Sequence, residues 1–522
     1  MNQKAVLNSA VRVLLSMTAT LAFAADPVAL KPGAMPRLAT VDERFQSFNV
    51  EMVEVTGGRF WAPYKKSALV EAPPAAKLAT PGVDPSLFRT REPINLASPR
   101  LRKLASALAP SYVRVSGTWA NSTFFQDSPG PALKAPPAGF GGVLSQAQWL
   151  GVLNFSRAVN AGIITSFAIS DGVRGPDGVW TAAEAGKILS FTQRQGGKIA
   201  AAELFNEPSF AAMGGAPKGY DAAAYGRDFQ AFAKFAHKAA PDMKILGPGS
   251  VGEAASLGNM ALLHTADLMT ATGPGVDIFS YHYYGAVSKR CAAMPGAAQT
   301  TADKALSPDW LARTERDAAF YAALRDRFEP GKPMWLTETG ETACGGNPWA
   351  ASFADSFRYL EQLGRLARRG VQVVAHNTLA ASDYGLIDEE TLTPRPNYWS
   401  ALLWRRLMGN TVLDSGVPLT GDVHVFAHCM RGHAGGVTLL AINPSATPQT
   451  LGIAGAAQVY RLTAAGALTD SSVALNGMRL EVGPGDKLPE LKGVAAKGGI
   501  AELPASSITF VTVPSAGNAA CR

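Results

Sequence analysis

The chain has 522 residues, of which 47% are hydrophobic and 17% are charged, and its formal net charge is +7. This composition excludes an intrinsically disordered chain and supplies enough apolar material for a large core and more than one domain. The basic residues form no dense Lys or Arg tract, so we expect no nucleic-acid partner.

The first 24 residues have the features of a secretory signal. They carry Lys4 and Arg12, no acidic residue, an apolar run and the small-residue pattern Ala22-Phe23-Ala24. The apolar run is shorter than the ~20 residues of a membrane span, and no other run approaches that length. We therefore expect cleavage near Ala24, a secreted or periplasmic protein and no stable membrane insertion.

Eight strand-like apolar segments follow in chain order, each bounded by Gly, Pro or polar residues. They are residues 45–52, 112–117, 164–170, 198–205, 244–250, 277–284, 333–339 and 371–377. Amphipathic stretches with apolar residues every three to four positions, such as 145–161 and 349–370, lie between them. This alternation predicts an α/β fold, a (β/α)8 TIM barrel over 45–409, with a doubly wound open sheet as the alternative.

The pattern changes from residue 410 onward. Short alternating runs such as VTLLAINPS and SSITFVTVP are separated by Gly, Pro and Ser, with no long helical pattern. They predict an antiparallel β-sandwich over 410–522. The segment 25–44 precedes the first barrel strand, and we expect it to contribute a strand to this sandwich.

Four cysteines are present, namely Cys291, Cys344, Cys429 and Cys521. An exported chain permits disulfides, and three pairings are possible. One of them joins Cys429 to Cys521 near the chain end and leaves Cys291 with Cys344. No CxxC pair occurs, so a zinc ribbon is not indicated, and we expect neither a metal nor a cofactor.

Two carboxylates stand at predicted strand exits, where a barrel of this type has its active site. Glu207 follows the fourth strand within ELFNEPSF, and Glu338 ends the seventh within PMWLTET. A facing pair of this kind can cleave a glycosidic bond, one carboxyl as proton donor and the other as nucleophile. We expect burial and the charge of Glu338 to raise the pKa of Glu207 above its usual ~4.3.

Further polar residues lie at the same exits. Asn206 offers an amide to a sugar hydroxyl, His282 and Tyr284 end the sixth strand, and Tyr384 follows the eighth. A tyrosine hydroxyl there can orient a carboxylate or donate to an anionic substrate.

Two other carboxylates need separate interpretations. Glu203 lies inside the fourth predicted strand, and we interpret it as support for the barrel interior. Glu341 follows Glu338 by three residues and is the rival nucleophile.

Several longer motifs occur in one order along the chain. They are SPRLRKLASALAPSYVRVSGT, NEPSF, SYHYYG, PMWLTETGETACGG and DYGLIDEETLTPRPNYWSALLWRRLMG, followed by a cysteine near the C-terminus. From about residue 40 to the end, the chain resembles the heparanase group of glycoside hydrolase family 79. The resemblance implies a retaining endo-β-glucuronidase that cleaves β-linked glucuronic acid in an anionic polysaccharide of the heparan sulfate type. We expect a monomer.

Two alternatives stay open. The first is an exo-β-glucuronidase of the same family, which needs the same carboxylates in a closed pocket. The second is a catalytically inactive protein that binds anionic glycans.

The resemblance also implies residue roles. Glu207 matches the family's general acid/base and Glu338 its nucleophile. Glu341 is therefore no longer the expected nucleophile. Asn206 contacts the sugar 2-hydroxyl, and Tyr284 positions the nucleophile.

The remaining implied roles concern the substrate's carboxylate and the disulfides. Gly345, Gly346 and Tyr384 bind the carboxylate, although Cys344 stands where the family usually has an aromatic residue. Glu51 and Asn121 match further sugar-contacting positions of the family, and His282, which ends the sixth predicted strand, is a further candidate for substrate binding. The terminal Cys521 matches the family's sandwich disulfide, which favours pairing with Cys429.

Overall fold

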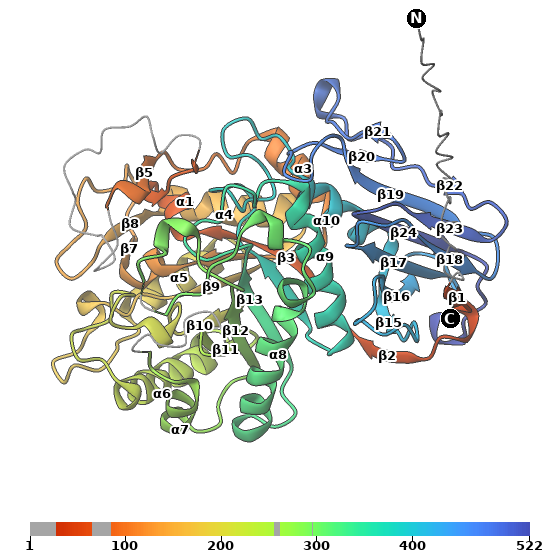
Figure 1. The fold of residues 1–522 in the computed structure, drawn as a ribbon. Helices are drawn as coiled ribbons and strands as arrows, with labels where there is room; N and C mark the ends of the chain where they lie inside the picture. Colours follow the sequence, from red (N-terminus) through yellow and green to blue (C-terminus); the bar gives the residue numbers. More distant parts are fainter. Residues whose placement is uncertain (1–27, 65–84, 255–261, 295) are drawn as a thin grey trace, which may run out of the picture.

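The computed structural model describes residues 28–64, 85–254, 262–294 and 296–522. The predicted signal, residues 1–24, lies outside these ranges. Eight parallel strands close into a barrel in chain order (Figure 1). They are β3 (Gln46–Glu51), β6 (Ser111–Ser116), β9 (Ala161–Ser166), β10 (Ile199–Glu203), β11 (Lys244–Ser250), β12 (Ile278–Tyr283), β13 (Met334–Thr339) and β14 (Val373–His376). The predicted TIM barrel is confirmed, and the doubly wound open sheet is excluded.

Strand β9 shows the largest shift from its predicted bounds. It begins at Ala161 because Ala161 and Gly162 pair with Ser111 and Tyr112 of β6, although neither is strongly apolar. It ends at Ser166 because the next backbone amides bond to loops, for example Phe167 N–H to the Leu204 carbonyl at 3.2 Å.

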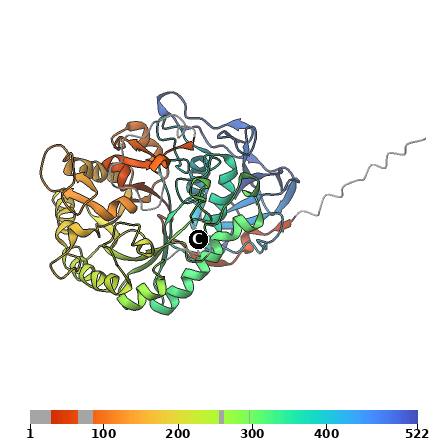
Figure 2. The same cartoon turned by 60° about the vertical axis from the view of Figure 1, so that its left-hand side comes forward.

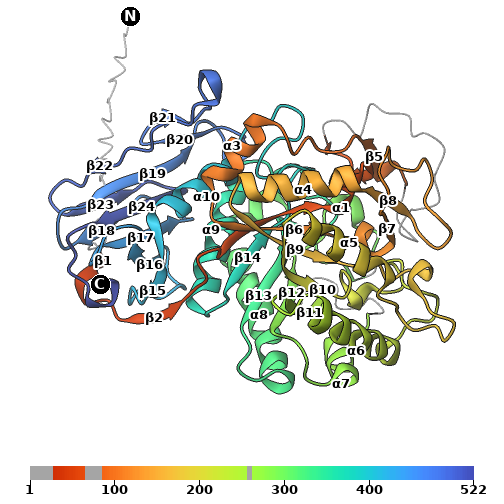
Figure 3. The same ribbon diagram turned by 180° about the vertical axis from the view of Figure 1, so that it is seen from behind.

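Helices follow the strands and cover the outside of the barrel (Figure 3). They are α1 (Met52–Thr56), α3 (Pro99–Ala107), α4 (Gln146–Ala158), α5 (Ala183–Arg194), α6 (Ala222–Ala239), α7 (Thr265–Thr272), α8 (Pro308–Phe328), α9 (Phe353–Arg368) and α10 (Pro396–Leu407). Helix α4 shows how the sequence sets them, since Ser145 and Gln148 form a capping box and Trp149, Val152 and Leu153 form a buried stripe. Among the described residues, no helix combines the length and apolarity needed to cross a bilayer.

The inside of the barrel changes from apolar to polar along the strands. One cluster takes a residue from each of six strands, namely Ile164, Ala201, Leu246, Ile278, Trp335 and Val373. Because side chains alternate along a strand, the residues two positions further on face inward again. There Glu203 accepts hydrogen bonds from Ser280 and Thr337. The polar end is the C-terminal end, where the active site of such a barrel lies.

Two further sheets lie beside the barrel (Figures 1 and 2). The large sheet runs β2-β15-β16-β17-β24-β19-β20-β21, with β22 paired to β19, and the small sheet runs β1-β18-β23. Their strands are β1 (Val28–Leu30), β2 (Arg37–Thr40), β15 (Met408–Leu413), β16 (His424–Met430), β17 (Val437–Asn443), β18 (Gln449–Ile453), β19 (Gln458–Ala464), β20 (Val473–Leu475), β21 (Met478–Arg479), β22 (Val494–Ala495), β23 (Ile500–Leu503) and β24 (Ser507–Val513).

A hydrophobic core joins the two sheets into a sandwich. It includes Leu30, Leu451 and Leu503 of the small sheet and Leu439 and Val511 of the large one. The N-terminal segment contributes strands to both sheets, β2 antiparallel to β15 and β1 parallel to β18. The predicted contribution of this segment is confirmed.

The other face of the large sheet packs against the barrel. Phe426 of β16 lies against α9 so closely that a Cβ on Gly364 would stand 2.4 Å from its ring. Helix α9 is therefore buried from Phe353 to Ala367, between the barrel and the sandwich. The Cys429–Cys521 disulfide ties the chain end to β16, as the resemblance implied.

Candidate active site

The two predicted catalytic carboxylates meet at the C-terminal end of the barrel. Glu338 lies in β13, and Glu207 lies four residues beyond the end of β10, directly before Pro208. One oxygen of each carboxylate and a ring nitrogen of His282 all lie within 4.8 Å of one another. Glu207 has a φ of 51°, an unusual conformation for a residue with a side chain, and such strain is often found at functional sites.

Arg114 of β6 connects the carboxylates from below. Its guanidinium donates to Glu338 Oε2 at 2.7 Å, to Glu203 Oε2 at 3.0 Å and to Asn206 Oδ1 at 2.8 Å. Burial would raise the pKa of Glu203, but the charge of Arg114 and the hydrogen bonds from Arg114 and Ser280 outweigh it and lower that pKa. Glu203 is thus an interior support that carries the charge balancing Arg114.

His282 positions Glu207. Its Nε2 lies 3.1 Å from Arg114 Nη2, and its Nδ1 lies 3.0 Å from Glu207 Oε1. Because a guanidinium carries only N–H groups, an Nε2–H pointing at it would be repelled, so we assign the ring proton to Nδ1. Burial lowers the pKa of His282 to about 4, with Glu338 opposing, so the ring is neutral near pH 7 and donates to Glu207.

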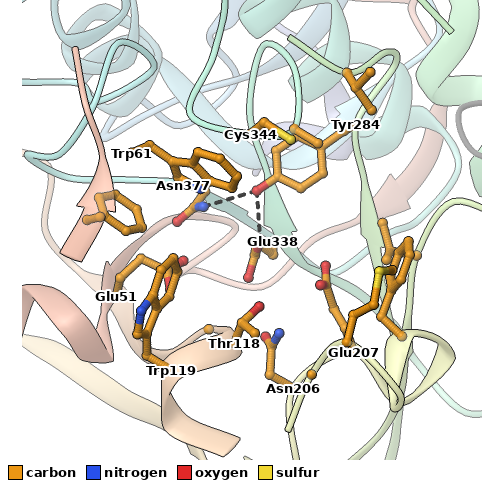
Figure 4. A pocket seen from close by; sticks show the side chains of 18 of the residues that line it. Glu51, Trp61, Thr118, Trp119, Asn206, Glu207, Tyr284, Glu338, Cys344 and Asn377 are labelled. Atoms are coloured by element: carbon orange, nitrogen blue, oxygen red, sulfur yellow. Dashed lines mark hydrogen bonds between the residues drawn. The ribbon is translucent and has the colours of Figure 1, made fainter. Parts of the chain in front are cut away.

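Tyr284 and Asn377 hold the other side of Glu338 (Figure 4). The Tyr284 hydroxyl donates to Glu338 Oε1 at 2.8 Å and accepts from Asn377 Nδ2 at 3.0 Å. Asn377 also donates to the Tyr384 hydroxyl at 3.3 Å. Both oxygens of Glu338 therefore act as acceptors, one toward Tyr284 and the other toward Arg114.

The Glu207 carboxyl lies in surroundings that disfavour its charge. Burial raises its pKa to about 7, with Arg114 opposing the rise and Glu203 adding to it. The rise confirms the expected direction. Its acidic contributor is Glu203, however, where the sequence analysis expected Glu338.

A pocket opens above these groups (Figure 4). Six of the predicted site residues line it, namely Glu51, Asn206, Glu207, Tyr284, Glu338 and Tyr384. Glu51 is buried, and burial followed by the charge of Glu338 raises its pKa well above its ordinary value. Glu51 lies against Gly117, the residue directly after β6, and a Cβ on Gly117 would stand 1.5 Å from Glu51 Oε2. Position 117 therefore requires glycine.

Four predicted site residues do not line the pocket. Asn121 is fully buried and bonds to the chain after β10: its Oδ1 accepts from Asn206 N–H at 2.8 Å, and its Nδ2 donates to the Asn206 and Gly214 carbonyls, both at 2.9 Å. His282 lies beneath the carboxylates. Gly345 and Gly346 lie in a turn whose residues Ala343 and Cys344 reach the pocket.

Glu341, the rival nucleophile, is fully buried below that turn. Its Oε2 accepts from Asn347 N–H at 2.7 Å and from the Thr342 hydroxyl at 2.8 Å, and its Oε1 accepts from Asn347 Nδ2 at 3.2 Å. Both oxygens are occupied, so Glu341 anchors the turn and does not face the pocket.

Sequence reasoning missed several residues of the site. Arg114 carried a usable signal, because a charged residue inside the apolar run YVRVSG must face inward if its neighbours face the helices. Asn377 ends the eighth predicted segment, directly after β14, and could have been weighed like Asn206. The pocket's apolar walls come from strand β4 (Gly58–Trp61) and from loops for which the strand pattern gave no signal, and they include Trp61, Trp119, Phe210, Met213 and Met294.

Glu207, His282 and Glu338 are also close enough together to hold a metal ion. Two features oppose this use. The Nδ1 of His282 carries a proton that it donates to Glu207, and the Arg114 cation lies in contact with Glu338. The geometry favours acid–base chemistry at these carboxylates.

Comparisons with known proteins find relatives among glycoside hydrolases. Residues 93–364, more than half of the chain, match the family described as "Glycosyl hydrolase family 79, N-terminal domain". Heparanase-like protein 1 of Arabidopsis thaliana is 28% identical over 370 residues, which cover 67% of this chain and 65% of that protein, slightly less than two thirds of its length. Heparanase of Mus musculus is 28% identical over 484 residues, covering 82% of this chain and 88% of that protein.

A solved structure shows the same fold at low identity. The crystal structure of a 4-O-alpha-L-rhamnosyl-beta-D-glucuronidase from Fusarium oxysporum superposes with a TM-score of 0.62 and 16% identity, covering 93% of this chain and 100% of that one. This match supports the arrangement of barrel and sandwich. With the family match over more than half of its residues, the chain belongs to glycoside hydrolase family 79.

Proposed function

We propose that this protein is a retaining β-glucuronidase that cleaves β-linked glucuronic acid inside heparan sulfate-like polysaccharide. The observation that carries the proposal is the approach of the Glu207 and Glu338 oxygens to within 4.8 Å. Retaining enzymes hold their carboxyl groups about 5 to 5.5 Å apart, whereas inverting enzymes need about 6.5 to 9.5 Å to admit a water molecule.

In the first step, Glu338 attacks the anomeric carbon and the bond from that carbon to the leaving oxygen breaks. Glu207 gives its proton to this oxygen, so the shortened glycan leaves as an alcohol. The pKa of about 7 keeps a large fraction of Glu207 protonated near neutral pH. Arg114 and Tyr284 fix the attacking carboxylate through its two oxygens.

In the second step, Glu207 acts as a base. It takes a proton from water, the resulting hydroxide attacks the anomeric carbon, and the bond to Glu338 breaks. Two inversions at one carbon leave its configuration unchanged. Asn206 lines the pocket, its Oδ1 accepts from Arg114 and its amide nitrogen donates to Glu207, which leaves the second N–H of that amide for the sugar 2-hydroxyl.

The substrate carboxylate is assigned to the turn after β13 and to Tyr384. Cys344, Gly345 and Gly346 have consecutive φ values of 62°, 82° and 84°. Successive backbone N–H groups in turns of this kind form concave anion sites. The Tyr384 hydroxyl faces the same pocket and can donate to the carboxylate.

Size analysis of the products tests the proposal. The protein is incubated with size-defined heparan sulfate and with an aryl β-glucuronide, and the products are separated by length. Internal fragments are expected. Release of monosaccharide alone would identify the exo-β-glucuronidase, and binding without products would identify an inactive glycan-binding protein.

A further inference from the structure

The disulfide Cys291–Cys344 joins two active-site loops. Cys291 is buried in the loop after β12, and Cys344 lines the pocket from the turn after β13 (Figure 4). Val287 and Met294, which flank Cys291, line the same pocket. The disulfide is thus part of the pocket wall.

We infer that this disulfide is a positioning element that holds the turn Cys344–Gly346 in the shape that receives the substrate's carboxylate. The inference rests on the proposed function. It assigns to Cys291 and Cys344 a role in substrate affinity in addition to fold stability.

The backbone of the turn requires an external constraint. Cys344 has a φ of 62°, and a residue with a side chain keeps such a conformation only where its surroundings enforce it. Gly345 follows at 82° and is packed so tightly that a Cβ there would lie 2.6 Å from the Trp61 Cβ and 2.7 Å from Ser382 Oγ. Small displacements of the turn would therefore change the pocket wall.

Hydrogen bonds hold the turn on both sides of Cys344. Ala343 N–H donates to the Ala286 carbonyl at 3.1 Å, and Ser288 N–H donates to the Ala343 carbonyl at 3.0 Å. On the C-terminal side of Cys344, the Ser288 hydroxyl donates to the Gly346 carbonyl at 2.8 Å. Between these contacts, the disulfide is the link from Cys344 itself to the loop after β12.

The backbone amides of the turn have no protein acceptor among the described residues, and the turn meets the pocket at Ala343 and Cys344. Within the described residues, the backbone N–H groups of Cys344, Gly345 and Gly346 donate no hydrogen bond to another protein group. Buried or half-buried N–H groups are normally paired, and a carboxylate can pair several of them at once. A shift of Cys344 would move all three donors together.

The experiment compares two disulfide-free variants. Cys291→Ala with Cys344→Ala removes the link at the pocket, and Cys429→Ala with Cys521→Ala removes the sandwich link, which does not line the pocket. Both are assayed with an aryl β-glucuronide and for inhibition by free D-glucuronate. The first variant should raise KM and the inhibition constant of D-glucuronate about tenfold, because the turn loses roughly one charge-assisted hydrogen bond to the carboxylate. Its kcat should stay within about twofold of the wild-type value.

The control variant separates positioning from stability. Cys429→Ala with Cys521→Ala should lower the melting temperature and leave KM unchanged. An unchanged KM in the Cys291→Ala, Cys344→Ala variant, or a fall in kcat without a rise in KM, overturns the inference while the proposed function stands. A wild-type protein that hydrolyses no β-glucuronide overturns the proposed function, and the inference with it.

Reduction of the folded wild-type protein gives the same test if the first variant fails to fold. A phosphine reductant opens the disulfide, mass spectrometry confirms the free thiols, and KM is measured before and after reoxidation. KM should rise on reduction and return on reoxidation. A KM that stays constant while the thiols at Cys291 and Cys344 are free contradicts the inference.

Discussion

Glu207 and Glu338 are the same residue type a few ångströms apart, and their partners differ. Glu207 is hydrogen-bonded by a neutral His282 and by the Asn206 side chain, and burial raises its pKa to about 7. Glu338 receives hydrogen bonds on both oxygens, from Arg114 and Tyr284. Different surroundings of this kind separate a proton donor from a nucleophile in glycosidases.

Replacement of Glu207 by Gln removes the proton donor and keeps the side-chain shape. We expect kcat to fall about 10² to 10⁴-fold on glycans, whose leaving groups need protonation, and less on an aryl glucuronide with an activated leaving group. Asp317→Asn is a matched control, since burial also raises the pKa of this carboxyl to about 7 and it lies outside the pocket. Near-normal activity of Glu207→Gln on both substrates would refute the assignment.

The pH dependence follows from the raised pKa of Glu207. The first chemical step needs its protonated form, so kcat/KM should fall by about tenfold per pH unit once the pH exceeds about 7. Initial rates at low substrate concentration between pH 5 and 9 measure this fall in kcat/KM. A profile that stays flat to pH 9 would show that another group donates the proton.

The same residue links stability to pH. The pKa of Glu207 is about 7 in the folded state and about 4.3 in the unfolded state, so its stabilising contribution is complete below pH 4.3 and is lost as the pH rises to 7. Glu207→Gln should therefore gain about 1 to 3 kcal/mol over the wild type at pH 8 and nearly nothing at pH 4. Urea unfolding at the two pH values measures the difference, and an equal gain at both would contradict it.

At the level of elements, the apolar runs located all eight barrel strands because each is buried on both faces. The same reasoning could not decide which polar residues of a strand face inward. Arg114 and Glu203 pair inside the barrel, and this contact between β6 and β10 depends on closure of the barrel. Gly249 of β11 is also packed against Glu203, since a Cβ there would lie 2.9 Å from Glu203 Oε1.

The loops after the strands were the least predictable part. Asn121 was predicted as a substrate contact, and the structure gives it three hydrogen bonds to the chain after β10. The sequence alone does not show whether a short polar side chain in a loop contacts a ligand or bonds to a neighbouring backbone. Its predicted role in substrate binding stays a prediction.

Asn121→Ala distinguishes the two roles. If Asn121 holds the loop that carries Asn206 and Glu207, the variant leaves buried backbone groups unpaired and loses about 1 to 3 kcal/mol of stability together with kcat. If Asn121 contacts the substrate, KM rises and the melting temperature stays constant. Thermal unfolding measured beside steady-state kinetics separates these outcomes, and we expect the first.

At the level of the whole molecule, we propose domain boundaries at residues 45–409 for the barrel and 410–522 for the sandwich, with 25–44 belonging to the sandwich. The two domains share α9, which is covered by the barrel on one side and by Phe426 on the other. This shared helix predicts that they unfold together.

Loss of the sandwich disulfide tests this coupling. Removal of Cys429 and Cys521 together should cost about 2 to 5 kcal/mol, because the link restricts the unfolded chain. Barrel and sandwich should still melt in one transition by calorimetry. Two separate transitions would show that contacts at α9 are too weak to couple the domains.

The sandwich also has a consequence for biosynthesis. Strand β24, the last of the chain, lies between β17 and β19 in the large sheet, and β1 pairs with β18, so that Val28 meets Leu451. A ribosome delivers β1 and β2 hundreds of residues before their partners exist, and the strand between β17 and β19 is missing until β24 has been made. The order of translation therefore cannot be the order of folding in this domain. Until β24 arrives, the strands made earlier have unpaired edges, and such edges are prone to pairing with other chains.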